Sequence, residues 1–211
     1  WLARVPAVAA GGLPPNQLFV NGVRRPRART CLRGAGRSRS LPLPLQSLRF
    51  NDGDFARWDN LDDVLIRAYS SWIVSLHWIK ELDLPNQIVT FTNRGWEFGR
   101  FDGHQRYIIE NFLPALDTPG EWFLDRKGTL HYWPRDGEKL TSISATMPVV
   151  QERLVEFAGD LRQDRYVEYM TFKGLSFRHV EWAVRRDSWY DHQDYAALNW
   201  AAIYATGLRH S

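Results

Sequence analysis

The sequence predicts an all-β protein in which an antiparallel β-sandwich is followed by the first turns of a coil of parallel strands. Two observations support this prediction. Residues 62–133 contain at least six short runs of alternating apolar and polar residues, each bounded by a turn signal, a spacing typical of sandwiches. From about residue 148 the runs are separated by Gly or polar corners, as in repeats that bury one face against the next.

The N-terminal region combines a predicted hairpin with a segment of unusual composition. Gln17–Val20 alternates like a strand, Asn21-Gly22 favours a type I′ turn, and the chain returns from Val23. Residues 30–49 have no apolar period, many Arg and Ser, and a Leu-Pro alternation. This composition predicts a loop or a disordered linker.

Three strands are predicted between residues 62 and 92. Asp62–Tyr69 and Trp72–Ile79 alternate, and Gln87–Thr92 follows the turn signal Leu84-Pro85-Asn86. Alternation places successive side chains on opposite faces of a strand. In the second strand one face is Trp72, Val74, Leu76 and Trp78, and the other is Ile73, Ser75, His77 and Ile79.

Further along, an aromatic hairpin is predicted. A strand over residues 106–112 precedes the turn Thr118-Pro119-Gly120, in which Pro presets φ and Gly accepts positive φ. Strands at 121–125 and 129–133 then flank the turn Arg126-Lys127-Gly128. After residue 148 the predicted short strands are 154–157, 166–169, 171–177 and 201–204, with 207–210 in register with 163–166.

The charge distribution argues against a nucleic-acid partner. Residues 1–51 carry nine Arg and no acid, a local charge of +9, whereas residues 52–211 carry −6, which together give the overall +3. A nucleic-acid binder groups its basic residues on a folded face. Here the basic residues lie mainly in one arm, and the aromatic-rich remainder is acidic.

The sequence gives no support for a disulfide, a metal site, a cofactor site or a membrane span. Cys31 is the only cysteine, so no intrachain disulfide can form, and the His residues lack metal-ligand spacing. No Gly-rich phosphate loop or nucleophile elbow is present, so neither a cofactor nor a metal is expected. No stretch reaches the roughly 20 apolar residues of a membrane span, so no membrane partner is expected.

Three segments resemble motifs of a known family, and they occur in the same order along the chain as in that family. Residues 105–138, QRYIIENFLPALDTPGEWFLDRKGTLHYWPRDGE, resemble a signature of large secreted carbohydrate-active proteins. Residues 17–29 and residues 169–182 match the same pattern. These proteins are the right-handed parallel β-helix glycoside hydrolases, including the α-L-fucosidase-like and β-xylosidase-like families.

The resemblance implies an organisation for the chain. It implies that the sandwich is inserted near the start of a right-handed parallel β-helix, with a strand hairpin and basic linker at 1–51, the sandwich at 52–147 and the first rungs at 148–211. The chain opens on Trp and stops within a rung, so we expect an N-terminal portion of a longer protein. The resemblance also implies an extracellular or periplasmic location.

The same resemblance points to residues that contact a carbohydrate substrate. His179 and Trp182 match the family's motif at the exit of the first coil, and Tyr190 and Gln193 match a weaker one. Trp faces stack on sugar rings, and His can donate to hydroxyl groups. The alternative is structural, with Trp182 capping the coil and His179 satisfying a backbone carbonyl.

The catalytic acids are not assigned. Glycosidases use two carboxylates, roughly 5–5.5 Å apart for retention and roughly 6.5–9.5 Å for inversion. The resemblance implies that these lie on later rungs, beyond residue 211. Local candidates lie in 181–195, where a solvated acidic loop is the favoured interpretation: Glu181, Asp187, Asp191 and Asp194. In the signature itself, Glu110-Asn111 and Glu121-Trp122 are predicted to hold backbone groups beside turns.

The predicted function is therefore a portion of a glycoside hydrolase that acts on polysaccharide or oligosaccharide side chains and is inactive alone. Two alternatives stay open. One is a non-catalytic carbohydrate-binding or surface β-helix protein. The other is a polysaccharide lyase, which would need a Ca²⁺-bound carboxylate cluster and a Lys or Arg base.

Overall fold

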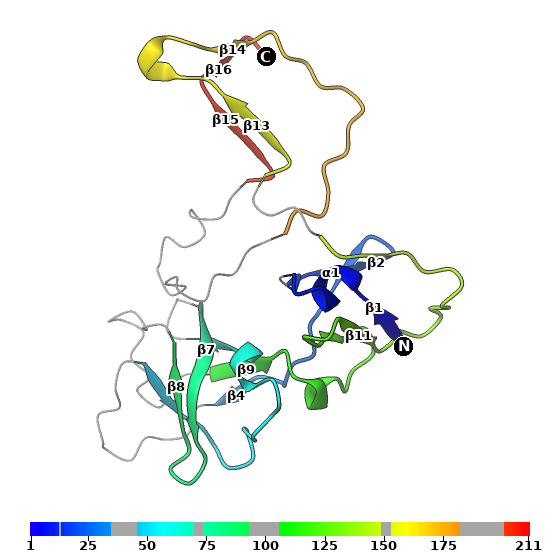
Figure 1. Ribbon diagram of the computed structural model, residues 1–211, viewed down its shortest axis with the longest axis vertical. Coiled ribbons are helices and arrows are strands. Elements are labelled where there is room, and N and C mark those ends of the chain that lie inside the picture. The colour runs from blue at the N-terminus through cyan, green and yellow to red at the C-terminus, as the bar shows by residue number, and fades with distance from the viewer. Residues whose placement is uncertain (13, 35–45, 70–73, 93–105, 149–152, 182–200) are drawn as a thin grey trace. The chain divides into compact units, whose positions relative to one another are not determined.

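A computed structural model describes the chain except for residues 13, 35–45, 70–73, 93–105, 149–152 and 182–200 (Figure 1). The chain divides into two compact units. Among the described residues, unit 1 comprises those of 1–14 and 25–143, and unit 2 comprises those of 15–24, 144–181 and 201–211.

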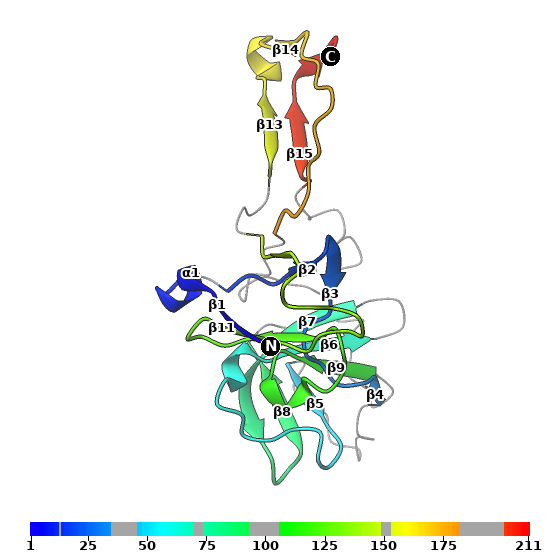
Figure 2. The ribbon, with the colours of Figure 1, turned by 90° about the vertical axis from the view of Figure 1, so that its right-hand side faces the viewer.

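Unit 1 is organised around a six-stranded antiparallel sheet (Figure 2). Neighbouring strands pair in the order β4-β9-β6-β7-β8-β5. A β-bulge interrupts the pairing of β7 with β8 between Ile79 and Glu81. The strands are β4 (Arg33–Gly34), β5 (Ser47–Arg49), β6 (Leu65–Tyr69), β7 (Val74–Asp83), β8 (Ile88–Phe91) and β9 (Arg106–Glu110).

The predicted strands of residues 62–92 and 106–112 are confirmed, because their alternation matches the burial. Ile66 and Ala68 are buried, and Ile66 pairs with both His77 and Ile109. Both faces of β7 are largely covered, because Ser75 and His77 are buried on one face and Leu76 and Trp78 on the other, while Val74 is 46% exposed. The polar pair is accommodated because His77 stacks on Phe91 and its Nε2 lies 2.8 Å from Ser75 Oγ.

The predicted loop over residues 30–49 is corrected. Its ends are strands β4 and β5, and positions 35–45 lie outside the described residues. Leu48 is 1% exposed and pairs with Val89. A strand of three residues is too short to display a period, which is why the composition concealed it.

A second antiparallel sheet in unit 1 has the order β1-β11-β10. It contains β1 (Leu2–Arg4), β10 (Trp122–Leu124) and β11 (Thr129–Tyr132), and the last two form the predicted aromatic hairpin. Phe123 joins the core with side chains of the larger sheet. The sequence did not predict β1 or the short helix α1 (Pro6–Ala9). Two 3₁₀ turns complete the described elements of unit 1, η1 (Leu61–Asp63) and η2 (Leu113–Ala115).

The predicted N-terminal hairpin is confirmed. β2 (Leu18–Val20) and β3 (Val23–Arg25) are neighbours in a sheet whose third strand is β12 (Ala145–Thr146). Asn21 has φ of 52° and Gly22 has φ of 75°. Positive φ at both central residues is what a type I′ turn requires.

The remainder of unit 2 contains two parallel strand pairs (Figure 1). β13 (Val155–Ala158) pairs with β15 (Ile203–Thr206), and β14 (Val167–Glu168) pairs with β16 (Leu208–Arg209). Between β13 and β14 the chain turns through η3 (Leu161–Gln163), whose first N–H groups are capped by Asp160.

Two predictions for this region are corrected. Residues 171–177 form no strand, and their apolar side chains, such as Phe172 and Leu175, are exposed. The segment predicted to align with 163–166 instead pairs with Val167 and Glu168, because η3 occupies 161–163.

The described residues are therefore nearly all β, with several antiparallel sheets and one short α-helix. The all-β prediction is confirmed. No helix in the described part of the chain is both long and apolar enough to cross a membrane.

Candidate functional site

Of the four predicted substrate-contact residues, the structure describes His179. Trp182, Tyr190 and Gln193 lie outside the described residues, as do Asp187, Asp191 and Asp194. His179 is half-buried and has φ of 62°, and its ring centroid lies 4.2 Å from that of Phe19. The Phe19 ring therefore packs against the imidazole with the two planes tilted by 54°.

Glu181, the remaining local acid, is held inside unit 2. It is 4% exposed, and its Oε2 accepts a hydrogen bond of 3.1 Å from the Asn16 backbone N–H. Gln17 Nε2 lies 3.4 Å from its Oε1 and donates to the Val180 carbonyl at 3.0 Å. These contacts join residues 16–17 to 180–181, so Glu181 serves the structure.

Three of the four signature residues are likewise structural: Asn111 and Trp122 hold backbone carbonyls as predicted, whereas Glu110 pairs with a side chain. Glu110 accepts from Arg67 Nε at 3.0 Å and from its Nη2 at 3.4 Å. Asn111 has φ of 70°, and its Nδ2 donates to the Asp63 carbonyl at 3.0 Å. Trp122 Nε1 donates to the Arg25 carbonyl at 3.0 Å.

Glu121, the fourth polar residue of the signature, differs. It is 5% exposed, and its Oε2 is buried with no hydrogen-bond partner among the described residues. Leaving a buried acceptor without a hydrogen bond costs about 1–3 kcal/mol, and more for a charged group, so proteins seldom keep one without a reason.

Glu121 lines a hollow of about 670 Å³ in unit 1, which we call the Glu121 hollow. Its volume lies within the roughly 300–1,000 Å³ typical of small-molecule sites. Trp58 forms an aromatic part of the wall and stacks on Phe112, with ring centroids 4.0 Å apart and planes 25° apart. The polar part of the wall includes Arg29, Thr30, Asp117 and Thr118.

Burial and the charged and polar groups of the hollow shift the pKa of the Glu121 carboxyl group. Burial raises the pKa of Glu121 above its ordinary value, and the charge of Asp117 raises it further. Backbone N–H groups of Asp117 and Thr118, and the Arg29 charge, oppose that rise in pKa without cancelling it. Asp54 also lines the hollow, but it accepts from Tyr107 and pairs with Arg33.

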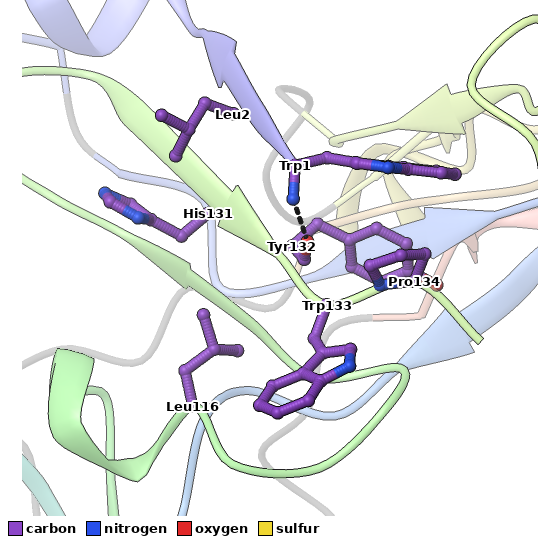
Figure 3. Close-up of a pocket in the computed structure, with 7 residues that line it drawn as sticks. All are labelled: Trp1, Leu2, Leu116, His131, Tyr132, Trp133 and Pro134. Atoms are coloured by element: carbon purple, nitrogen blue, oxygen red, sulfur yellow. Dashed lines mark hydrogen bonds between the residues drawn. The ribbon is translucent and has the colours of Figure 1, made fainter.

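A second hollow in unit 1, of about 310 Å³, is mainly apolar, and we call it the aromatic hollow (Figure 3). The Trp1 amine nitrogen donates to the Tyr132 carbonyl at 2.6 Å, which fixes β1 beside β11. Trp133 is 44% exposed and offers a ring face to solvent. The lining residues are Trp1, Leu2, Leu116, His131, Tyr132, Trp133 and Pro134.

The described residues bring together no group of three or more His, Cys, Asp or Glu side chains that could hold a metal ion. Sequence reasoning did not find the Glu121 hollow. Arg29, Trp58 and Glu121 are far apart along the chain, and a Glu beside a turn gives no local signal that it will be buried.

Comparison with known proteins identifies a solved structure with a similar fold. A solved structure named glycoside hydrolase is similar, with a TM-score of 0.62 and 22% sequence identity over 86% of this chain. The match covers 34% of that protein, so this chain spans about a third of its length. No protein-family model matches the sequence, and no curated protein does. The likeness supports a glycoside hydrolase-like fold.

Proposed function

We propose that the chain is the N-terminal portion of a right-handed parallel β-helix glycoside hydrolase of the α-L-fucosidase-like or β-xylosidase-like kind. Its substrates are polysaccharide or oligosaccharide side chains. The proposal includes a hairpin and linker at 1–51, an inserted sandwich at 52–147 and the first rungs at 148–211. It also includes an extracellular or periplasmic location.

The observation that carries this proposal is the pair of parallel ladders in unit 2. Val155 pairs with Ile203 and Val167 with Leu208, so both ladders join the same two distant stretches of chain. Parallel strands need a long crossover connection, and a chain that returns repeatedly to parallel register is the basis of a coil. The fold likeness to a glycoside hydrolase supports the glycoside hydrolase part of the proposal.

In this proposal, His179, Trp182, Tyr190 and Gln193 contact sugar. His179 is suited to the role because Phe19 limits the rotation of its ring while leaving it half-exposed. A positioned imidazole nitrogen can donate to a sugar hydroxyl. Hydrolysis by two carboxylates would require acids on later rungs, so this chain supplies substrate contacts.

The proposal is tested by separating binding from turnover. We expect the 211-residue chain to bind oligosaccharides without hydrolysing aryl glycosides, and His179→Ala to weaken binding by roughly tenfold, the equivalent of one hydrogen bond. His210→Ala is the matched control, because His210 is an exposed histidine of the same unit.

Turnover by the isolated chain would contradict the placement of the acids on later rungs. Equal effects of His179→Ala and His210→Ala would remove His179 from the proposed contacts. Chelator-sensitive release of unsaturated products from a longer chain would identify a lyase instead.

A further inference from the structure

Glu121 is a buried polar group that the proposed function does not use. Its carboxyl group is almost fully buried, yet Oε2 has no hydrogen-bond partner within the described chain. Its neighbours in the signature, Glu110, Asn111 and Trp122, all make internal hydrogen bonds. The chain therefore keeps one unsatisfied acceptor beside a hollow large enough for a ligand.

The charges around the hollow narrow the class of ligand. Arg33 and Asp54 pair with each other, and the other charged residues of the lining are Arg29, Asp117 and Glu121. A ligand with a net charge of either sign would meet charges of both signs in this lining, so part of it would be repelled. A neutral ligand whose hydroxyl groups both donate and accept can satisfy acids and guanidinium together.

The lining of the hollow also includes an aromatic surface against which a ligand ring can pack. Trp58 is half-buried, and its stacking on Phe112 fixes the plane of the indole. Small-molecule sites combine such an aromatic surface with a few placed polar groups. Metal binding has no support, because no three potential ligands gather in the described part of the chain.

We propose that the Glu121 hollow binds a neutral sugar ring, with Glu121 accepting from a ring hydroxyl, Arg29 donating to another and Trp58 covering one side. The choice of a sugar among neutral polyhydroxy compounds rests on the proposed function. The site itself is additional to the contacts proposed at 179–193, and it requires no catalytic step.

The proposal is tested by calorimetric titration of the 211-residue chain with neutral methyl glycosides of xylose, galactose and fucose. Glucosamine and glucuronate are the charged comparisons. We expect saturable binding of at least one neutral glycoside and weaker binding of both charged sugars. Glu121→Gln should weaken the binding by about tenfold or more, because hydrogen bonds to a charged group contribute about 1.5–3 kcal/mol.

The matched control is Glu81→Gln, which changes an exposed glutamate of the same unit and should leave the affinity unchanged. A thermal melt checks that Glu121→Gln folds. Since the pKa of Glu121 is raised on folding, its favourable contribution is complete below the ordinary value of 4.5 and is lost as pH rises. The Gln variant should therefore be at least as stable as the parent at neutral pH.

Three results would overturn the proposal. The first is the absence of any neutral glycoside binding with a Kd of about 10 mM or tighter. The second is a preference for either charged sugar. The third is equal affinity in the parent and Glu121→Gln. The comparison of Glu121→Gln with His179→Ala separates this proposal from the proposed function, because the first variant tests only the Glu121 hollow and the second only the contacts at 179–193.

Discussion

The two units differ in how far they bury their apolar side chains. In unit 1 the antiparallel strands enclose a core in which Val64, Ile66, Phe91 and Ile109 are inaccessible to solvent. In residues 153–181 and 201–211 of unit 2 the strands pair, yet many large apolar side chains of these stretches stay exposed. These are Leu161, Tyr169, Met170, Phe172, Leu175, Phe177, Ile203, Tyr204 and Leu208.

The difference shows that strand pairing and core formation are separate events. An antiparallel sheet with a second layer closes its own core. A parallel pair in a coil buries its side chains only when further rungs stack on it. Exposed apolar side chains in unit 2 are therefore consistent with the proposed β-helix, whose first rungs are covered only when later rungs stack on them.

The largest expected effect comes from truncating the same side chain in the two regions. Phe91→Ala removes a fully buried ring of β8 and should lower the free energy of unfolding by about 3–5 kcal/mol. Phe172→Ala removes a ring that is 47% exposed and should change that free energy by about 0.5 kcal/mol or less. Urea unfolding followed by tryptophan fluorescence measures both. Equal losses would mean that Phe172 belongs to a packed core.

A smaller effect is expected at the buried ion pair of unit 1. Arg25 Nη2 lies 2.6 Å from Glu138 Oε1, and the two side chains are 6% and 9% exposed. Tyr132 Oη and the Arg135 backbone N–H also donate to Glu138 Oε2, at 2.6 and 2.8 Å. Glu138→Gln should cost about 1.5–3 kcal/mol of unfolding free energy at pH 7. The exposed pair of Glu168 and Arg209 in unit 2 is the comparison, and Glu168→Gln should have a much smaller effect.

The cost of Glu138→Gln should depend on pH. Burial by itself would raise the pKa of Glu138, but hydrogen bonds from Tyr132, Arg135 and Arg25 hold it below its ordinary value. A lowered pKa stabilises the fold above the ordinary value of 4.5, and the gain disappears as pH falls through the folded pKa. Unfolding curves of parent and variant should therefore converge at acid pH. A constant difference down to low pH would show that the charge of Glu138 is not responsible.

The smallest and most local effect is expected at Gly159, which directly follows β13. An added Cβ would lie 2.8 Å from the Gly207 carbonyl oxygen and 2.9 Å from those of Arg165 and Thr206. Gly159→Ala should therefore separate β13 from β15 and speed amide exchange in both strands by about tenfold or more. The control is Ala158→Ser at the exposed neighbouring position. Unchanged exchange in Gly159→Ala would show that the parallel pair does not depend on this close approach.

How far the sequence alone could be read differs along the chain. The strands of residues 62–92 and 106–133 were predictable, because a two-residue period survives wherever one face is buried. The strand over 47–49 was not predictable, since three residues carry no period. The burial of His77 was also missed, because a polar residue reveals its partner Ser75 and the stacked Phe91 only in three dimensions.

The sequence by itself determined the local structure: the all-β class, the turn at Asn21-Gly22 and the order of the hairpins. These depend on the φ preferences and alternation of neighbouring residues. The tertiary structure decided which side chains are covered, which strands are parallel, and that Glu121 lies buried beside Arg29 and Trp58. Burial and charge environment depend on segments that are distant along the chain, and no local pattern encodes them.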